Sequence, residues 1–297
     1  MHDYRKLQML ALCSIPLIVS GSALAQDADD AAPDSGESAS LSDRVHVSLS
    51  LDYTSQYFFR GLVQETDGLI LQPGIEIGFD LVDNDDFTLG AYVGGWSSFH
   101  DERTGATDPD EFVSRWYEFD FYAGVSMSSG RFSADVAYTN YTAPNGAFGH
   151  IDEVIVTLAW DDSGWLDWVT LSPYATVAIE FGANQGDGGS DLGTFFALGI
   201  EPSHTYESTP FGEITVSAPI EAGFSLSDYY EGATGDETFG YLSSGLAVSI
   251  PLPAPEGFGD WTWSAGVDYL LLGDTTEAIN GGDDDEWIIH TGISFEF

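Results

Sequence analysis

The last twelve residues of the chain, 286–297, alternate between apolar and polar side chains. Read in steps of two, one face carries Trp287, Ile289, Thr291, Ile293, Phe295 and Phe297, and the other carries Ile288, His290, Gly292, Ser294 and Glu296. This period of two is typical of a β-strand with one apolar side. A last strand that ends on an aromatic residue is what outer-membrane β-barrels present to the barrel-insertion machinery, which we therefore expect as a partner of Phe297. We also expect this strand to close a ring against the first strand.

The first 25 residues have the pattern of a cleaved secretory signal. Arg5 and Lys6 precede an apolar run over about residues 9–19, and Ala23-Leu24-Ala25 provides the small residues of a cleavage site. The single cysteine, Cys13, lies inside this segment. The mature protein is therefore expected to have no disulfide and no cysteine-based metal site.

Residues 26–43 are acidic and lack hydrophobic periodicity, which predicts a disordered periplasmic segment. Beyond the signal, no stretch approaches the roughly 18 consecutive apolar residues of a membrane helix. If residues 44–297 span a membrane, they must form a closed β-barrel, because an open sheet would leave unpaired backbone groups in lipid.

The chain is strongly acidic, with 49 Asp and Glu against 7 Lys and Arg and a net charge of −42. This balance argues against nucleic acid as a partner and against charge-driven binding to anionic membranes. It suits an exported protein of a halophilic organism, because salt screens the repulsion between like charges. Attraction of cations is the alternative to a simply solvated acidic surface.

The alternating pattern recurs from Val45 onward in twelve segments, an even number as in single-chain bacterial outer-membrane barrels. The expected strands are 45–57, 69–83, 87–99, 116–127, 131–142, 151–161, 168–181, 194–202, 211–224, 239–252, 261–272 and 286–297. A turn is expected near 60–68. Elsewhere, short or modest connections, including one near 203–210, alternate with mostly longer ones, which predicts periplasmic turns and extracellular loops. The predicted fold class is all-β, a single transmembrane antiparallel up-and-down barrel.

Aromatic side chains on the predicted lipid face gather at the strand ends. The outer group is Tyr57, Phe59, Tyr117, Tyr138, Phe181, Phe224 and Trp287, and the periplasmic group is Phe79, Phe87, Phe132, Trp160, Trp263, Phe295 and Phe297. Leu, Val, Ile and Ala lie between them, as in a barrel seated in a bilayer. The alternative, a soluble β-sandwich, would bury its aromatic side chains in mid-strand.

Several stretches of the amino-terminal half are similar to a known family. They are Leu51-Asp-Tyr-Thr-Ser-Gln-Tyr-Phe-Phe-Arg-Gly61, Gln72-Pro-Gly74, Gly90-Ala-Tyr-Val-Gly-Gly-Trp96, Glu118-Phe-Asp-Phe-Tyr-Ala-Gly124 and Tyr138-Thr-Asn-Tyr141. Over roughly residues 45 to 160 the chain resembles the TorF-type porin family, and the Phe-Arg-Gly ending of the first stretch is the most specific part. The resemblance implies an outer-membrane protein of porin type, without a substrate or assigned functional residues.

The face opposite the lipid carries twelve carboxylates, which we expect to require a wet lumen because an isolated ionised group in a dry interior is costly. The side chains predicted to line a pore are Asp52, Glu76, Asp135, Asp268 and His290 near mid-height, and Glu118, Asp120, Glu153, Glu180, Glu221 and Arg60 nearer the outer mouth. Since rings of carboxylates favour cations, the sequence predicts a weakly cation-selective channel for passive diffusion of small hydrophilic solutes, cationic or neutral. The alternative is a narrow or plugged barrel that acts as a structural or adhesion protein through its acidic extracellular loops.

The sequence favours neither catalysis nor a cofactor. It contains no Gly-x-Ser-x-Gly motif. His100 beside Asp101 and Glu102 is interpreted as a solvated loop triplet in preference to a metal site. The acidic runs 187–191 and 283–286 offer oxygen ligands for Ca²⁺ or Mg²⁺, but they lack EF-hand spacing and are predicted to be solvated loops.

Overall fold

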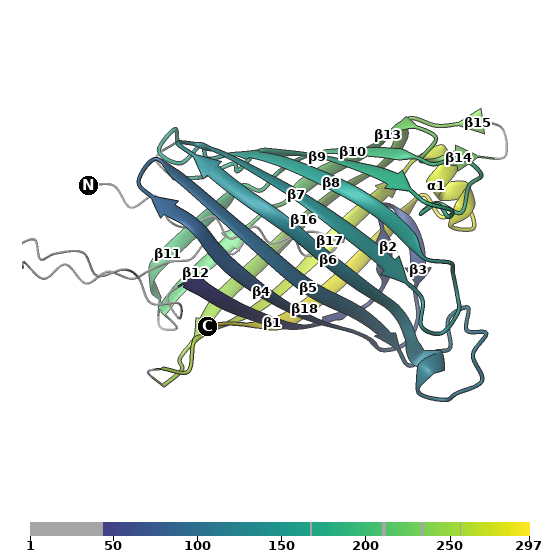
Figure 1. Ribbon diagram of the computed structural model, residues 1–297, viewed down its shortest axis with the longest axis horizontal. Helices are drawn as coiled ribbons and strands as arrows, with labels where there is room; N and C mark the ends of the chain where they lie inside the picture. The colour runs from purple at the N-terminus through teal and green to yellow at the C-terminus, as the bar shows by residue number, and fades with distance from the viewer. Residues whose placement is uncertain (1–43, 167, 210–211, 233–234, 256) are drawn as a thin grey trace, which may run out of the picture.

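The computed structural model describes residues 44–297 apart from 167, 210–211, 233–234 and 256. The predicted signal peptide (1–25) and acidic segment (26–43) lie outside the described residues. Within them the regular elements are almost all strands, and these wind around a common axis (Figure 1). Among the described residues, no helix has the length and apolar character that crossing a membrane requires.

Twelve antiparallel strands form a closed barrel wall. In chain order they are β1 (Val45–Thr54), β4 (Ile70–Asn84), β5 (Phe87–His100), β6 (Trp116–Ser129), β7 (Phe132–Thr142), β8 (Ile151–Trp160), β9 (Tyr174–Phe181), β10 (Thr194–Ile200), β13 (Ile220–Ser227), β16 (Phe239–Leu252), β17 (Asp260–Leu272) and β18 (Asp285–Glu296). The ring closes where β18 pairs with β1, with Leu51 opposite Ile293. Phe297 continues this pairing, because its N–H and C=O bond the backbone of Val47 at 3.0 and 2.8 Å. The predicted twelve-stranded barrel, closed by the last strand against the first, is confirmed.

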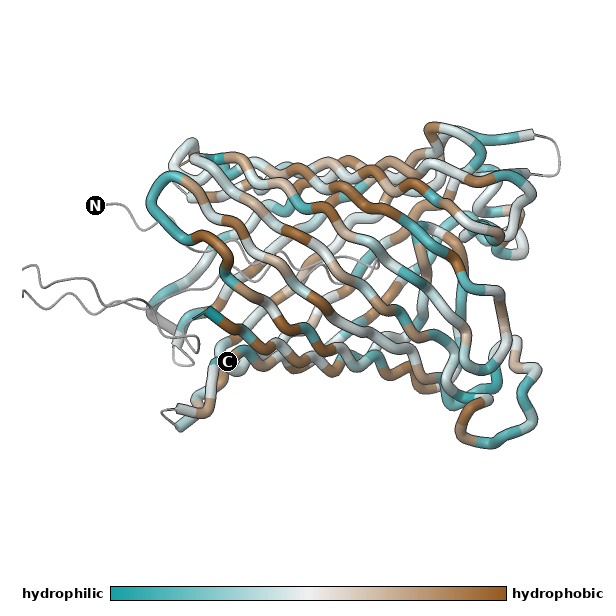
Figure 2. Tube along the Cα trace, viewed as in Figure 1, coloured by the Kyte–Doolittle hydropathy of each residue, from teal (hydrophilic) through white to brown (hydrophobic). Residues whose placement is uncertain are grey.

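The outward-facing surface of the barrel wall carries large, exposed apolar side chains. Leu51, Leu158, Leu246 and Ile289 are 52, 56, 60 and 58 % exposed. Figure 2 shows hydrophobic and hydrophilic residues alternating along the strands. Large apolar side chains this exposed around a whole barrel are favourable only in lipid, where closure also leaves no unpaired edge. This is the architecture of bacterial outer-membrane proteins, and the predicted location in the outer membrane is confirmed.

The wall departs from the predicted strands where prolines interrupt it. Strand β11 (Ser203–Thr209) forms where a connection was expected. It pairs with β12 (Gly212–Ser217), which is the first part of the predicted strand 211–224. Pro202 separates β10 from β11, and Pro219 separates β12 from β13. β9 likewise begins at Tyr174, directly after Pro173, and not at residue 168. Proline has no backbone N–H to donate to a ladder, so these strands end beside it.

The end of the barrel that the sequence predicts to face outward, called the outer end from here on, carries several short elements. They are β2 (Tyr57–Phe59), β3 (Leu62–Glu65), η2 (Val113–Arg115), β14 (Glu231–Gly232), β15 (Gly235–Asp236) and α1 (Asp274–Ile279). β2 and β3 pair as a hairpin, and Figure 1 shows them at the barrel end that also carries α1 and β14. Phe58 and Leu62 of this hairpin are only 1 and 4 % exposed, because the hairpin folds into the barrel.

The inward hairpin corrects part of the aromatic prediction. Tyr57, Phe59 and Tyr117 were expected in the outer lipid-facing group, but they are buried in one cluster inside the outer end. The prediction failed because an aromatic side chain that faces lipid and one that packs inside the lumen can occur in the same local sequence pattern. Other members of the girdles, such as Phe132 and Trp287, are well exposed at 69 and 61 %.

Candidate functional site

The hairpin turns back at Arg60 and Gly61. Both residues have positive φ, 51° and 82°, and they connect the paired residues Phe59 and Leu62. Two consecutive left-handed residues make the two-residue turn whose twist suits a β-hairpin. A Cβ on Gly61 would lie 3.1 Å from the ring of Tyr241 on β16. The Arg-Gly pair therefore sets the tip close against the barrel wall.

The Arg60 side chain lies in a cage of one carboxylate and several aromatic rings. Its Nη1 and Nη2 donate to Oε1 and Oε2 of Glu153 at 2.7 and 2.8 Å, and Nη1 also donates to the Tyr229 hydroxyl at 2.8 Å. Tyr141 donates to Oε2 of Glu153 at 2.9 Å. The guanidinium carbon lies 4.4 Å from the centre of the Phe195 ring. Since Arg60 and Glu153 are 4 and 0 % exposed, the bidentate pair is shielded from water and fixed in direction.

Backbone groups of the hairpin tip are held by two outer-loop residues. Tyr230 donates its hydroxyl to the Arg60 carbonyl at 2.9 Å. Asn280, which follows α1, donates Nδ2 to the Gly61 carbonyl at 2.7 Å and accepts the Val63 N–H on Oδ1 at 2.8 Å. The tip is thus bonded on both sides by segments far away in the sequence.

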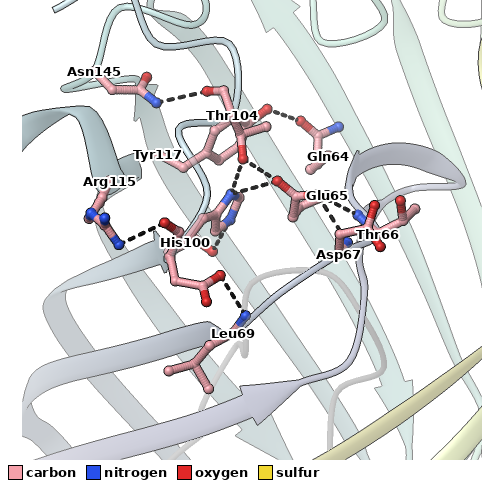
Figure 3. A network of polar contacts seen from close by, with 12 residues as sticks. Gln64, Glu65, Thr66, Asp67, Leu69, His100, Thr104, Arg115, Tyr117 and Asn145 are labelled. Carbon is pink, nitrogen blue, oxygen red and sulfur yellow. Dashed lines mark hydrogen bonds and ion pairs between the residues drawn. The ribbon is translucent and has the colours of Figure 1, made fainter. Parts of the chain in front are cut away.

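The base of the hairpin is tied to the loop between β5 and β6 (Figure 3). Glu65 accepts the N–H groups of Thr66 and Asp67 at 2.9 and 3.0 Å, and it also accepts the Thr104 hydroxyl. His100 Nδ1 lies 2.9 Å from the Thr104 hydroxyl and 3.8 Å from Glu65. The carboxylate of Glu65 therefore joins β3 to the outer loop.

His100 is buried at the end of β5. The prediction that it belongs to a solvated loop triplet is therefore wrong. Its Nε2 lies 2.9 Å from the Ser98 hydroxyl, and its ring stacks on Tyr117 with centres 4.5 Å apart. Tyr117 in turn donates its hydroxyl to Gln64 of the hairpin. His100 thus supports the hairpin base, and its two ring nitrogens already have hydroxyl partners.

The predicted lining acids near the outer mouth surround the hairpin and are almost completely buried. Their exposed fractions are 5 % for Glu118, 0 % for Asp120, 0 % for Glu153, 4 % for Glu180 and 7 % for Glu221. Neutral groups donate to four of them, namely the hydroxyls of Tyr57, Tyr141, Tyr174 and Tyr241 and the N–H groups of Gly186 and Gly193. The expectation that these acids require water is therefore wrong for Glu118, Glu153, Glu180 and Glu221. Asp120 has no donor partner among the described residues, and it interacts electrostatically with Glu118.

The predicted mid-height residues also face the barrel interior. Asp135 accepts the Tyr92 hydroxyl at 2.8 and 3.0 Å, and Asp268 lies 3.2 Å from His290. Glu76 is buried, whereas Asp52 is half-buried. The structure thus brings the eleven predicted residues to the inner side of one barrel. That they line a conducting path stays a prediction.

The sequence analysis missed the aromatic partners of these acids and of Arg60. Those on the wall are Tyr92, Tyr122, Tyr141, Tyr174, Phe195 and Tyr241. Their positions along the strands could have revealed them, because each lies an even number of residues away from inward-facing small or acidic residues of the same strand. Tyr229, Tyr230 and Asn280 come from outer loops, where no periodic pattern indicates which way a side chain points.

The acidic loop 187–191 holds its place through hydrogen bonds to its carboxylates. Asp187 accepts the N–H of Gly189 at 2.8 Å and that of Glu231 at 2.9 Å. Glu231 accepts the N–H groups of Ser190 and Asp191. These carboxylates accept hydrogen bonds from backbone N–H groups, so they hold the two loops together and are not arranged as ligands around an ion.

Comparisons with solved structures find other barrels. An outer-membrane channel from Pseudomonas putida F1 is 9 % identical with a TM-score of 0.47, and the match covers 90 % of this chain and 100 % of that one. LpxR from Salmonella typhimurium is 12 % identical with a TM-score of 0.44, covering 84 and 99 % of the two chains. The NanC porin is 12 % identical with a TM-score of 0.39, covering 84 and 98 %.

The sequence itself matches one family. No curated protein matches the chain. The family described as "Bacterial protein of unknown function (Gcw_chp)" matches residues 38–250, which is more than half of the 297 residues. This match does not confirm the resemblance to TorF-type porins. It does show that the chain belongs to the Gcw_chp family of bacterial proteins of unknown function.

Proposed function

We propose that the protein is an outer-membrane channel for passive diffusion of small hydrophilic solutes, with a weak preference for cations, and that the β2–β3 hairpin closes it in the described state. The observation that carries this proposal is the inner wall, where acidic side chains from many strands converge around one hairpin that is not part of the wall sheet. Carboxylates that surround a path lower the energy of cations and raise that of anions. The porin-type resemblance of residues 45 to 160 supports the same function.

The hairpin is a suitable gate because side-chain contacts hold it. The Arg60–Glu153 pair and the bonds from Tyr230 and Asn280 link it to the wall and outer loops. Its two strands pair with each other and form a sheet of their own, separate from the barrel sheet. The hairpin can therefore leave the lumen without breaking any backbone ladder of the wall.

The second candidate is a non-conducting structural or adhesion barrel that works through its acidic outer loops. The packing of the outer half favours it, because Phe58, Tyr229 and Tyr230 are at most 1 % exposed and form part of one apolar cluster. In that case the hairpin is a permanent plug that stabilises the barrel.

Conductance in a planar bilayer tests the two candidates. The refolded protein, with folding verified by heat-modifiable gel migration, should show steps and a reversal potential of cationic sign in a salt gradient. Asp52→Asn with Glu76→Gln should reduce that potential, whereas Asp85→Asn, at an exposed periplasmic turn, should not. A folded protein that stays silent, also after removal of the Arg60 side chain, would refute the channel.

We also propose how the protein is exported, inserted into the membrane and adapted to its habitat. Residues 1–25 are a signal that is removed on export, and residues 26–43 precede the barrel on the periplasmic side. The barrel-insertion machinery recognises the strand that ends at Phe297. The acidic composition adapts the protein to a saline habitat.

A further inference from the structure

The cage around Arg60 has the geometry of a guanidinium site. The two terminal nitrogens of the guanidinium meet the two oxygens of Glu153, at 2.7 and 2.8 Å. Aromatic rings flank the cation, with Phe195, Phe59 and Tyr229 centred 4.4, 4.7 and 5.3 Å from its central carbon. A planar fork satisfies such a site better than an ammonium group, because it bonds both oxygens at once and presents flat faces to the rings.

Most of the cage belongs to the barrel and its outer loops, while its occupant belongs to the hairpin. Glu153 lies on β8, Tyr141 on β7 and Phe195 on β10. Tyr141 donates to Glu153 independently of Arg60, and the Tyr229 N–H is bonded to Ser225 at 3.0 Å. When the hairpin leaves the lumen, these walls stay in place and only the Phe59 ring leaves with Arg60.

Two carboxyl groups besides that of Glu153 lie near the cage. Glu221 lines the same small cavity as Arg60, and Glu180 interacts electrostatically with both Arg60 and Glu153. Backbone N–H groups donate to Glu180 and phenol hydroxyls donate to Glu221, so neutral donors hold both groups. Three acids thus surround one cation. An emptied cage leaves Glu153 as a buried carboxylate without a counter-charge, which strongly favours entry of another cation.

We propose that this cage is a binding site for small guanidinium-bearing solutes and that Arg60 is its tethered occupant. The inference rests on the proposed channel function and names a class of solute for it. A solute with a guanidinium group takes the place of Arg60 and holds the hairpin in the displaced position. Because a tethered group competes at an effective concentration on the order of millimolar, free solutes bind the wild-type protein only weakly.

The first test is binding of ethylguanidinium to the refolded, detergent-solubilised Arg60→Ala variant, followed by calorimetry. This probe replaces most of the atoms that the substitution removes. The expected result is saturable binding at least tenfold tighter than that of ethylammonium. Binding should be lost in the double variant Arg60→Ala with Glu153→Gln, and it should weaken several-fold when Phe195→Leu is added to Arg60→Ala.

A second variant covers the case in which Arg60→Ala does not fold. Arg60→Lys keeps a cation in the cage but replaces the fork with a single ammonium group. Ethylguanidinium should displace this poorer occupant at a concentration at least tenfold lower than in the wild-type protein. Equal binding of ethylguanidinium and ethylammonium, or binding that persists without the Glu153 carboxylate, overturns the proposal.

Binding is measured without a bilayer, so the guanidinium site and the channel can be refuted independently of each other. Selective binding together with a silent bilayer would refute the channel and retain the cage. Conductance steps without guanidinium-selective binding would retain the channel and refute the cage. In a conducting protein, ethylguanidinium added on the loop side should raise the open fraction of the wild type more than an equal concentration of NaCl does.

Discussion

Asn280→Ala should weaken the closed position of the hairpin without opening the barrel wall. The amide of Asn280 makes two partly buried bonds to the hairpin tip, at 2.7 Å to the Gly61 carbonyl and at 2.8 Å from the Val63 N–H. At about 0.5–1.5 kcal/mol net for each bond, the variant loses about 1–3 kcal/mol of closed-state stability. The displaced population should therefore rise about 5- to 150-fold.

The assay is modification of a cysteine placed at Leu62. This side chain is 4 % exposed in the closed hairpin, and the only natural cysteine, Cys13, lies in the predicted signal. When opening and closing are fast compared with the reaction, the rate of labelling by a maleimide reports the displaced population. Leu62→Cys alone and Leu62→Cys with Asn280→Ala should differ by the factor given above.

Ile279, the last residue of α1 and the neighbour of Asn280 in sequence, provides the control. Ile279 is 42 % exposed, so Ile279→Ala should change the labelling rate by less than about twofold. The heat-modifiability of the barrel should be the same in all variants, because the ladders of the wall are untouched. Equal labelling rates with and without the Asn280 amide would refute the claim that this residue holds the hairpin in the lumen.

Three further predictions test the hairpin tip, the lipid face and an outer loop. Gly61→Ala should destabilise the closed hairpin by about 1–2 kcal/mol or more, because φ at this position is 82° and the added Cβ would lie 3.1 Å from Tyr241. An unchanged labelling rate of the cysteine in Leu62→Cys would contradict this prediction. Leu246→Lys, at a side chain 60 % exposed to lipid, should cost about 2–4 kcal/mol of folding free energy in liposomes, and an unaltered denaturant midpoint would argue against a mid-membrane position. The pKa of Glu231 is lowered because the N–H groups of Ser190 and the next residue donate to its carboxylate. The stabilisation that the Glu231 carboxylate gives this loop is therefore present above pH 4.5 and is lost as the pH falls through the lowered pKa. Hydrogen-exchange protection of these amides should fall as the pH is taken below 4.5 in the wild type but not in Glu231→Gln.

The barrel was predictable from the sequence because its rules are local. A strand with one face in lipid must alternate with period two, so that twelve alternating segments indicated twelve strands before any pairing was known. The inward parity of Glu153 and Glu221 followed from the same rule. Proline positions set the exact strand ends, and Pro219 shows how one residue divides the predicted strand 211–224 into two elements, β12 and β13.

The content of the lumen was decided only by the tertiary structure. Tyr57, Phe59 and Arg60 continue the pattern of the first strand, and nothing in their spacing distinguishes an outer rim from a hairpin folded inward. Arg60 meets Glu153 across 93 positions of the chain and Tyr229 across 169. Alternation fixes which side of a sheet a residue faces, because that depends on the backbone alone. Which partner fills the enclosed space depends on closure of the ring, which brings distant strands and loops around one hairpin.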